Sequence, residues 1–118
     1  MRAMLLSAQA RIETSPLELR DVPVPSPAAG EVRIKVHCCA VCRTDLHVIE
    51  GDLPPQKMPV IPGHQVVGII DAIGPACRRL KVGQRIGIAW LRKTCGQCRF
   101  CTTGRENLCP NSLYTGYH

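Results

Sequence analysis

The residues in this sequence best suited to chemistry are four cysteines spaced Cys-x2-Cys-x2-Cys-x7-Cys. They are Cys95, Cys98, Cys101 and Cys109. Short turns between them let each sulfur reach one common point, as a tetrahedral zinc ion with Zn–S bonds of about 2.3 Å requires. Dense Cys-x2-Cys spacing in a chain without secretory features is typical of metal binding. The spacing therefore predicts a closed, structural zinc site.

Two other interpretations of the four cysteines remain open. They could form disulfides or lie unconnected in a core, although both are less usual for this spacing. They could also hold an iron–sulfur cluster, because Pro110 follows Cys109 as in bacterial ferredoxins. In those ferredoxins, however, the last gap is about three residues rather than seven. Zinc is the preferred interpretation.

The composition predicts an aliphatic domain rich in strands. The chain has 118 residues, a length that suits one domain with a real core. Only four residues are aromatic, so Val, Ile, Leu and Ala must build most of that core. The four aromatic residues are Trp90, Phe100, Tyr114 and Tyr117.

The net charge of +6 could suggest a nucleic acid or an anionic membrane as partner. Part of that charge surrounds the cysteine cluster, where cations offset the net −2 charge of a zinc ion held by four thiolates. These cations are Arg92, Lys93, Arg99 and Arg105. There is no run of five basic residues, and aromatic side chains are too sparse for base stacking. We therefore expect no nucleic-acid partner.

The hydropathy of the chain predicts no membrane partner. No stretch approaches the ~20 apolar residues of a membrane span. Residues 1–10 resemble a signal peptide only weakly, because their apolar run is short and Arg11 and Glu13 follow at once. Together these observations predict a soluble protein in the reducing cytoplasm, and eight cysteines in that setting favour metal over disulfides.

The elements that must position these groups are mostly short strands. Strands are predicted at residues 3–8, 17–22, 32–36, 65–73 and 86–90. Residues 32–36 alternate strictly and predict a half-buried strand, whereas 65–73 are nearly all apolar and predict a fully buried one. Residues 42–50 predict a short helix that Gly51 ends. The overall prediction is a mainly β, barrel-like domain with a loop-built zinc lobe at about residues 91–113.

Cys42 and His64 form a second candidate pair. Cys42 lies where a strand gives way to the predicted helix, and His64 follows the turn residues Pro62 and Gly63. Their separation is too wide for spacing alone to establish a metal site. A small core thiol and a hydrogen-bonded histidine explain the two residues equally well.

Several motifs together carry a family resemblance. In chain order they are Cys42-Arg43-Thr44-Asp45-Leu46-His47, Pro62-Gly63-His64-Gln65, Val82-Gly83-Gln84-Arg85, the cysteine cluster, and Thr115-Gly116-Tyr117. This order resembles the zinc-dependent medium-chain alcohol dehydrogenases. The resemblance covers nearly the whole chain. It implies that residues 1–118 form a GroES-like catalytic domain, a partly open barrel with short helices.

The resemblance also implies ligands for two zinc ions. Cys42 and His64 match ligands of the catalytic zinc, and Asp45 matches a carboxylate that orients the zinc-bound imidazole. The four clustered cysteines match the ligands of the structural zinc. The remaining cysteines, Cys38, Cys39 and Cys77, match no ligand and are predicted to be buried apolar thiols.

Four further residues acquire roles from the resemblance. Thr44 and His47 match a relay that carries the alcohol proton towards solvent. Arg43 matches a contact to the coenzyme pyrophosphate, and Trp90 matches a wall of the substrate pocket. Taken singly, Thr44 suits a helix cap and His47 a solvated helix face. Arg43 suits a surface charge, and Trp90 suits an ordinary core position.

The sequence departs from the family pattern in two ways. Gln65 stands where the family has a glutamate able to approach the zinc. No Gly-x-Gly-x-x-Gly occurs, so these residues contain no dinucleotide-binding Rossmann domain, and a further family cysteine ligand is also missing. We therefore expect the N-terminal catalytic domain of an enzyme, inactive by itself, with an incomplete catalytic zinc site.

The implied reaction is oxidation of an alcohol to an aldehyde or ketone, with hydride transfer to NAD or NADP. The partners are then a small alcohol or aldehyde, and the full-length enzyme is expected to be a homo-oligomer. The alternative is a non-catalytic zinc-binding module that acts through protein interactions. Such a module has no reason to carry Cys42, Thr44, His47 and His64 together.

Overall fold

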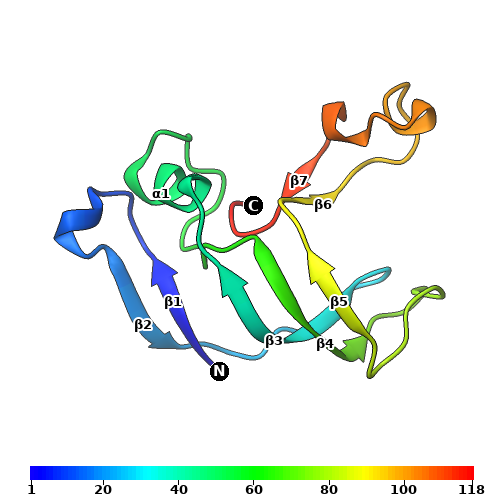
Figure 1. Cartoon of the computed structure of the whole chain (residues 1–118), viewed down its shortest axis with the longest axis horizontal. Coiled ribbons are helices and arrows are strands. Elements are labelled where there is room, and N and C mark those ends of the chain that lie inside the picture. Colours follow the sequence, from blue (N-terminus) through cyan, green and yellow to red (C-terminus); the bar gives the residue numbers. More distant parts are fainter.

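The chain is built mainly of β-strands, and the computed structural model describes it from Met1 to His118 (Figure 1). The strands are β1 (Arg2–Leu6), β2 (Leu17–Asp21), β3 (Val32–Ala40), β4 (Gln65–Ile73), β5 (Arg85–Ile88), β6 (Leu91–Lys93) and β7 (Leu113–Tyr114). The helices are α1 (Arg43–Glu50) and the short 3-10 helices η1 (Ile12–Thr14), η2 (Cys101–Thr103) and η3 (Glu106–Leu108). None of the helices has the length and apolar character that crossing a bilayer requires.

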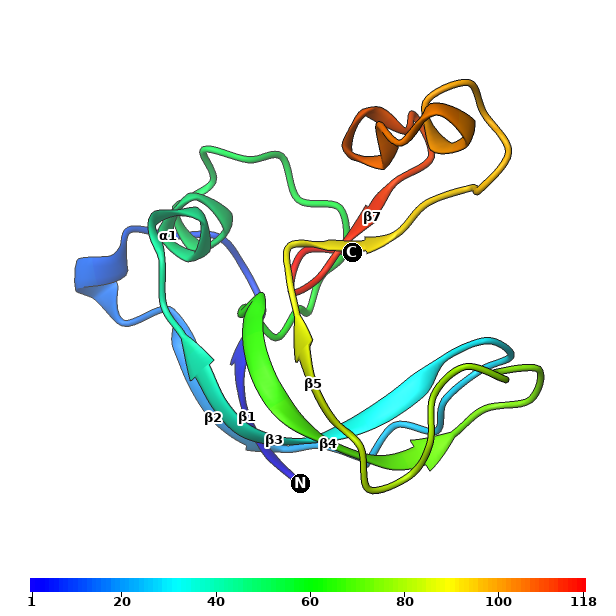
Figure 2. The same cartoon turned by 45° about the vertical axis from the view of Figure 1, so that its right-hand side comes forward.

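The strands form three separate antiparallel sheets, which are β1–β2, β3–β4–β5 and β6–β7. The central sheet is strongly curved, and the segment between β6 and β7 projects away from it (Figure 2). The predicted mainly β class is confirmed. The barrel is open, because no hydrogen bonds join the three sheets into a closed surface.

Strand β3 differs from its prediction in length and in burial. It continues to Ala40 instead of ending at residue 36, and its register against β4 shifts between Arg33 and Ile34 and again between Val36 and Cys38. Each irregularity changes which face the following side chains occupy. Val36, predicted to be on the buried face, is 56% exposed. The predicted half-buried alternation is therefore wrong at Val36, the last residue of the predicted strand.

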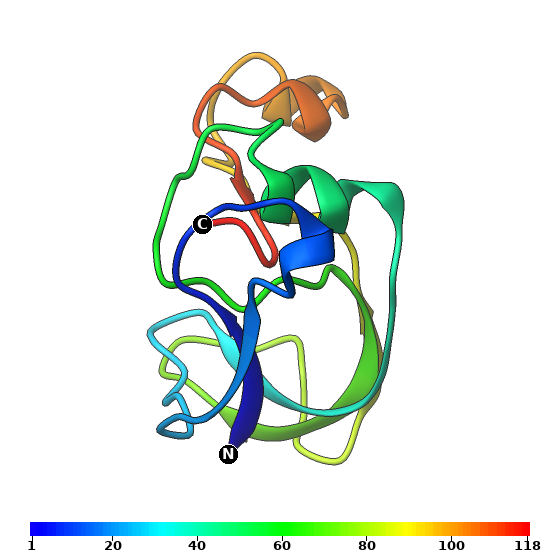
Figure 3. The same cartoon turned by 90° about the vertical axis from the view of Figure 1, so that its left-hand side faces the viewer.

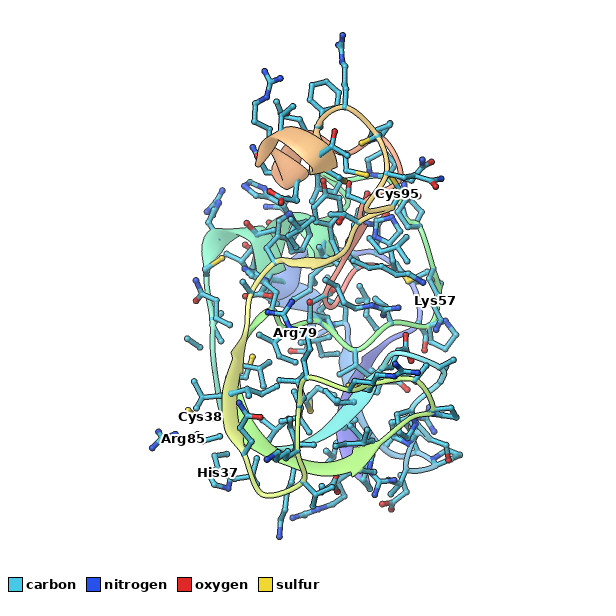
Figure 4. All side chains as sticks on the ribbon, turned by 90° about the vertical axis from the view of Figure 1, so that its right-hand side faces the viewer. His37, Cys38, Lys57, Arg79, Arg85 and Cys95 are labelled. Carbon is cyan, nitrogen blue, oxygen red and sulfur yellow. The ribbon has the colours of Figure 1, made fainter.

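Strand β4 has the predicted bounds but not the predicted burial. It lies between β3 and β5, yet only Gly68 and Ile70 along it are buried. The prediction that Cys38, Cys39 and Cys77 are buried is also wrong, because the first two are exposed and Cys77 is half-buried. Cys38 lies at the outer edge of the sheet in Figure 4. Apolar composition predicts strand formation here, but the faces of this sheet are incompletely covered.

The core is small and lies where α1 packs beside β1. Only 11 of the 118 residues are buried, so most apolar side chains keep some contact with water. Figure 3 shows η1 beside α1, and the two elements are in contact. The core is aliphatic as predicted, with one aromatic member added. Its members are Leu6, Val48, Ile49, Val60 and Tyr117.

Helix α1 begins and ends as the sequence predicts. Cys42 is its N-cap, and the Asp45 carboxylate accepts a hydrogen bond from the Cys42 backbone N–H, which completes a capping box. At the other end Gly51 adopts a left-handed conformation with φ +93°. Glycine suits that position because it lacks the Cβ that makes left-handed backbone costly.

The last residues of the chain return to the segment before β4. The Thr115 backbone N–H donates to the Trp90 carbonyl at 2.9 Å, and its hydroxyl donates to the Ala89 carbonyl at 2.9 Å. Gly116, with φ +70°, then lies so close to Gly63 that a Cβ at residue 116 would meet the Gly63 oxygen at 2.5 Å. This contact fixes the backbone next to His64.

We expect Gly116→Ala to destabilise the chain more than Gly30→Ala does. Both glycines have similar left-handed φ values, +70° and +76°, but nothing lies within 4 Å of a Cβ at residue 30. Each variant places an L-residue in the left-handed region at a cost of about 1–2 kcal/mol, and Gly116→Ala adds a backbone clash. Urea unfolding of the two zinc-loaded variants measures the difference. Equal losses of unfolding free energy would show that the contact with Gly63 relaxes easily.

Candidate metal centres

The first candidate centre is the projecting lobe between β6 and β7. These two strands pair at its base, Leu91 with Tyr114 and Lys93 with Leu113. The lobe carries the four clustered cysteines on turns and on η2 and η3, and Figure 4 labels Cys95 within it. The sequence predicts the lobe as a loop-built unit. It does not predict the short β6–β7 ladder, whose two partners lie about twenty residues apart.

The sulfur atoms of the lobe lie at distances that suit one four-coordinate ion. The Sγ–Sγ distances are 3.9 Å for Cys95 and Cys101, 3.6 Å for Cys98 and Cys101, and 3.6 Å for Cys95 and Cys109. Tetrahedral coordination with Zn–S bonds of about 2.3 Å places sulfur atoms about 3.8 Å apart. All four cysteines are free thiols. An iron–sulfur cluster suits them less well, because the four thiolates then bind several iron atoms and the sulfur atoms surround a larger body.

Backbone N–H groups support negative charge on the lobe sulfurs. The Cys98 N–H donates to the Cys95 sulfur and the Cys95 N–H donates to the Cys109 sulfur, each at 3.4 Å. Hydrogen bonds from the backbone N–H groups of Gln97 and Cys98 lower the pKa of Cys95 to about 6. Desolvation raises the pKa of Cys101 to about 11. Cys95 therefore becomes a thiolate, the form that binds metal, more readily than Cys101 does.

Two of the basic residues beside the cluster pack against an aromatic ring. The guanidinium groups of Arg99 and Arg105 lie 4.6 Å and 5.7 Å from the centre of the Phe100 ring. These distances are within the range of cation–π attraction. The two charges therefore stay close to the cysteine turns, as the sequence interpretation expects.

The second candidate centre joins Cys42, Asp45 and His64. The Cys42 sulfur lies 3.1 Å from His64 Nε2, and His64 Nδ1 lies 3.0 Å from Asp45 Oδ1. Asp45 and His64 are 6% and 5% exposed. The start of α1 supplies two of these residues, and the turn before β4 supplies the third. The fold thus brings together groups that are 22 residues apart.

The carboxylate of Asp45 is fully engaged with protein groups. One oxygen contacts His64, and the other accepts the Cys42 backbone N–H at 2.8 Å. A carboxylate beside Nδ1 favours the tautomer that carries hydrogen there, which leaves Nε2 free to bind a metal. Asp45 is therefore suited to orient His64 and is not needed as a ligand itself.

The Cys42 and His64 atoms suit zinc with a small adjustment. Tetrahedral bonds of about 2.3 Å to sulfur and about 2.05 Å to nitrogen place the two ligand atoms about 3.6 Å apart. The observed 3.1 Å requires that they open by about half an ångström. A soft thiolate and an imidazole are both ligands that zinc prefers. These two side chains fit the ion but do not by themselves complete its coordination.

The same three side chains could also act as a nucleophile (Cys42), a base (His64) and an acid that orients the base (Asp45). Cysteine hydrolases use a thiol, an imidazole and a third group in this way. Zinc competes directly with that chemistry, because it takes the same sulfur and Nε2 lone pairs. Geometry alone therefore allows either a metal ligand set or a reactive thiol.

An aromatic cluster from two chain segments lies beside His64. The Trp90 ring meets His64 edge-on at 5.1 Å and stacks on Tyr114 at 4.9 Å and on Tyr117 at 5.7 Å. Trp90 lies beside the second centre. Its role in lining a substrate pocket stays a prediction. The two tyrosines were not predicted there. Their proximity depends on the contact between Gly116 and Gly63, for which the sequence gives no local signal.

The remaining predicted residues lie on or near α1. Arg43 is exposed at the start of the helix, whereas Thr44 and His47 are half-buried and lie one helical turn apart. His47 Nδ1 is 2.7 Å from Asp52 Oδ2, a contact that the sequence did not predict. Gln65, at the start of β4, is exposed. Arg43 and Gln65 make no contact with Cys42 or His64 that explains their types.

Comparison with known proteins places these features in a family. Residues 28–117 match the family model described as the alcohol dehydrogenase GroES-like domain. A Mycobacterium tuberculosis protein described as "Probable alcohol dehydrogenase AdhA" is 52% identical over 111 residues, which covers 90% of this chain and 32% of that protein. A Geobacillus stearothermophilus alcohol dehydrogenase is 47% identical over 102 residues, which covers 86% of this chain and 30% of that protein.

Solved structures give the same result. An NAD-dependent alcohol dehydrogenase superposes with a TM-score of 0.89 at 34% identity, over 100% of this chain and 34% of the other. A cobalt- and zinc-bound thermostable alcohol dehydrogenase from Pyrobaculum aerophilum gives 0.90 at 30% identity, over 99% and 35%. The chain thus spans about a third of the length of these relatives. With its fold, its lobe and its motifs in agreement, the chain belongs to the alcohol dehydrogenase family, of which it forms the GroES-like domain.

Proposed function

We propose that this chain is the catalytic-domain portion of a zinc-dependent alcohol dehydrogenase that oxidises an alcohol to an aldehyde or ketone with NAD or NADP. The observation that carries the proposal is the buried Asp45–His64–Cys42 arrangement, which presents a sulfur and an imidazole nitrogen to one point. Family membership supports it, because the relatives are named alcohol dehydrogenases. Family membership also favours metal binding by Cys42 over the alternative that Cys42 is a reactive thiol.

In this proposal Cys42 and His64 hold the catalytic zinc. When bound there, zinc supplies a positive charge that polarises the oxygen of the substrate. Asp45 holds His64 in the tautomer that leaves Nε2 unprotonated. The four lobe cysteines hold a second, structural zinc. Its function is to close the lobe, since ligand binding and folding are coupled in sites of this kind.

Thr44 and His47 move the alcohol proton in this proposal. They lie on the same side of α1 because they are three residues apart. The Thr44 hydroxyl can both accept and donate a hydrogen bond, and His47, 37% exposed in its side chain, can pass a proton to water. Trp90 forms an apolar wall beside His64, and Arg43 offers its exposed charge to the coenzyme pyrophosphate.

The division of the enzyme into domains is part of the proposal. Residues 1–118 act as the GroES-like domain with its zinc lobe at about residues 91–113, and a separate Rossmann domain binds the coenzyme. The rival function, a non-catalytic zinc-binding module, has less support, because it does not explain why Thr44, His47, Cys42 and His64 occur together. A structural role in protein interactions requires only the lobe.

We expect the purified chain to bind one zinc ion tightly through the lobe. Cys98→Ser should release this zinc, because it removes a thiolate from a four-ligand site, whereas Cys77→Ser should not. Elemental analysis of the two variants and of the unmodified chain measures zinc and iron together. A brown protein rich in iron would contradict the zinc assignment.

We expect the second zinc ion to bind weakly in this chain. Cys42 and His64 supply two ligands, whereas catalytic zinc sites in proteins usually have about three. After dialysis, zinc should therefore remain near one per chain and not two. A second zinc ion that survives dialysis and disappears in His64→Ala would show that the site is more complete than we propose.

We expect no measurable alcohol oxidation by the 118-residue chain alone. Holding the nicotinamide near the reacting carbon contributes on the order of 7–11 kcal/mol, and this chain carries no Gly-x-Gly-x-x-Gly motif of a dinucleotide-binding domain. A chimera with the remaining two thirds of the M. tuberculosis relative should be active. Its rate of NAD or NADP reduction in the presence of alcohols measures the effect.

The chimera also tests the assigned residues. Cys42→Ala and His64→Ala should abolish its activity and leave the lobe zinc in place, whereas Cys38→Ala should have little effect because that thiol is exposed on β3. NAD reduction by the short chain alone that His64→Ala removes would contradict the proposed division of tasks between the domains.

A further inference from the structure

We propose that Asp52 is a positioning residue for His47, which it holds in the tautomer with hydrogen on Nδ1 and an unprotonated Nε2. This inference rests on the proposed function of His47 as a proton carrier. It adds an acidic partner to the relay, from the loop that follows α1.

The first argument is the contact itself. His47 Nδ1 lies 2.7 Å from Asp52 Oδ2. An ionised carboxylate can only accept hydrogen bonds, so Nδ1 must carry the hydrogen. In a neutral imidazole the other nitrogen, Nε2, is then without hydrogen and acts as the acceptor. A proton carrier that receives a proton from Thr44 needs an accepting nitrogen of this kind.

The second argument is how the backbone brings Asp52 to His47. The left-handed Gly51 turns the chain back, so that the N–H groups of Gly51 and Leu53 both donate to the His47 carbonyl at 3.2 Å. Asp52 lies between these two donors. Both flanking peptides are thus tied to His47, and the Asp52 side chain is brought back to the ring of a residue five positions earlier.

The third argument is that a distant side chain holds this loop. Gln9 Nε2 donates to the carbonyls of Val48 and Leu53, each at 2.9 Å. Its side chain thereby joins the last turn of α1 to the residue after Asp52. The Ala10 N–H donates to the Ile49 carbonyl at 3.1 Å and supports the same helix end. These hydrogen bonds therefore hold the loop after α1 that carries Asp52 in place beside His47.

The fourth argument is that no other acid holds the ring. Glu50, on the same helix, accepts the Ile12 backbone N–H at 3.1 Å. On η1, which packs against α1, Glu13 pairs with Arg11 at 3.5 Å. The side chains of His47 and Asp52 are 37% and 60% exposed, so their pairing adds little to stability. We therefore infer that the main effect of Asp52 is to orient the imidazole of His47.

Nitrogen NMR of the zinc-loaded chain tests the tautomer directly. At a pH where the imidazole is neutral, we expect His47 to carry hydrogen on Nδ1 and none on Nε2. Asp52→Ala should convert this signature to a mixture of both tautomers, whereas Glu13→Gln should leave it unchanged. Asp52→Glu, with a longer arm, should restore part of it. An Nε2-protonated His47 in the unmodified chain, or no change in Asp52→Ala, would overturn the inference.

Kinetics of the chimera with a coenzyme domain test the consequence. Asp52→Ala should lower kcat by about tenfold with little change in KM, which is the lower end of the losses seen when the partner of a metal-binding imidazole is removed. In a His47→Ala background it should have no further effect, because the two residues act as a unit. An equal loss in both backgrounds would show that Asp52 acts through the fold instead.

The two readouts separate the failure of this inference from failure of the proposed relay. If His47→Ala leaves kcat unchanged, the proposed relay through His47 is wrong. Asp52 then has no role in the reaction, whichever tautomer the NMR shows. If His47→Ala lowers kcat but Asp52→Ala changes neither kcat nor the tautomer, the relay stands and only the role of Asp52 is overturned.

Discussion

The buried carboxylate of Asp45 is the constraint on which the rest of the second centre depends. It receives a backbone N–H from Cys42 with one oxygen and contacts His64 Nδ1 with the other. A buried charge without such partners is strongly unfavourable, so both contacts must form together. One residue therefore completes the capping box of α1, holds the Cys42 backbone, and fixes the ring that faces Cys42. The same contacts thus serve the start of the helix and the geometry of the site.

A second constraint acts from the end of the chain. Gly63 and Gly116 touch through their backbones, which is possible only because Gly116 carries no Cβ. This places Tyr114 and Tyr117 against Trp90 and Trp90 against His64. Three of the four aromatic residues of the chain, Trp90, Tyr114 and Tyr117, thus gather at one place. They give an otherwise aliphatic domain a stiff apolar wall beside its candidate metal ligands.

Features set by local sequence were predictable. The four-cysteine lobe follows from its spacing, the bounds of β4 from an apolar run, and α1 from its capping residues and Gly51. Features that depend on distant contacts could not be predicted from local sequence. The pairing of Cys42 with His64 needed the family resemblance, because a 22-residue separation has no characteristic spacing. The contact between Asp52 and His47 required knowledge of the turn at Gly51. The exposure of Cys38 and Cys39 depends on what covers the central sheet, and on two irregularities in β3 that alternation cannot predict.

The small number of buried residues has a thermodynamic consequence. The heat-capacity change of unfolding and the denaturant slope both scale with the surface that unfolding newly exposes. A chain that buries 11 of 118 residues has already left much of its apolar surface in water while folded. Its free energy of unfolding therefore varies gently with temperature and with urea, and its transitions are broad.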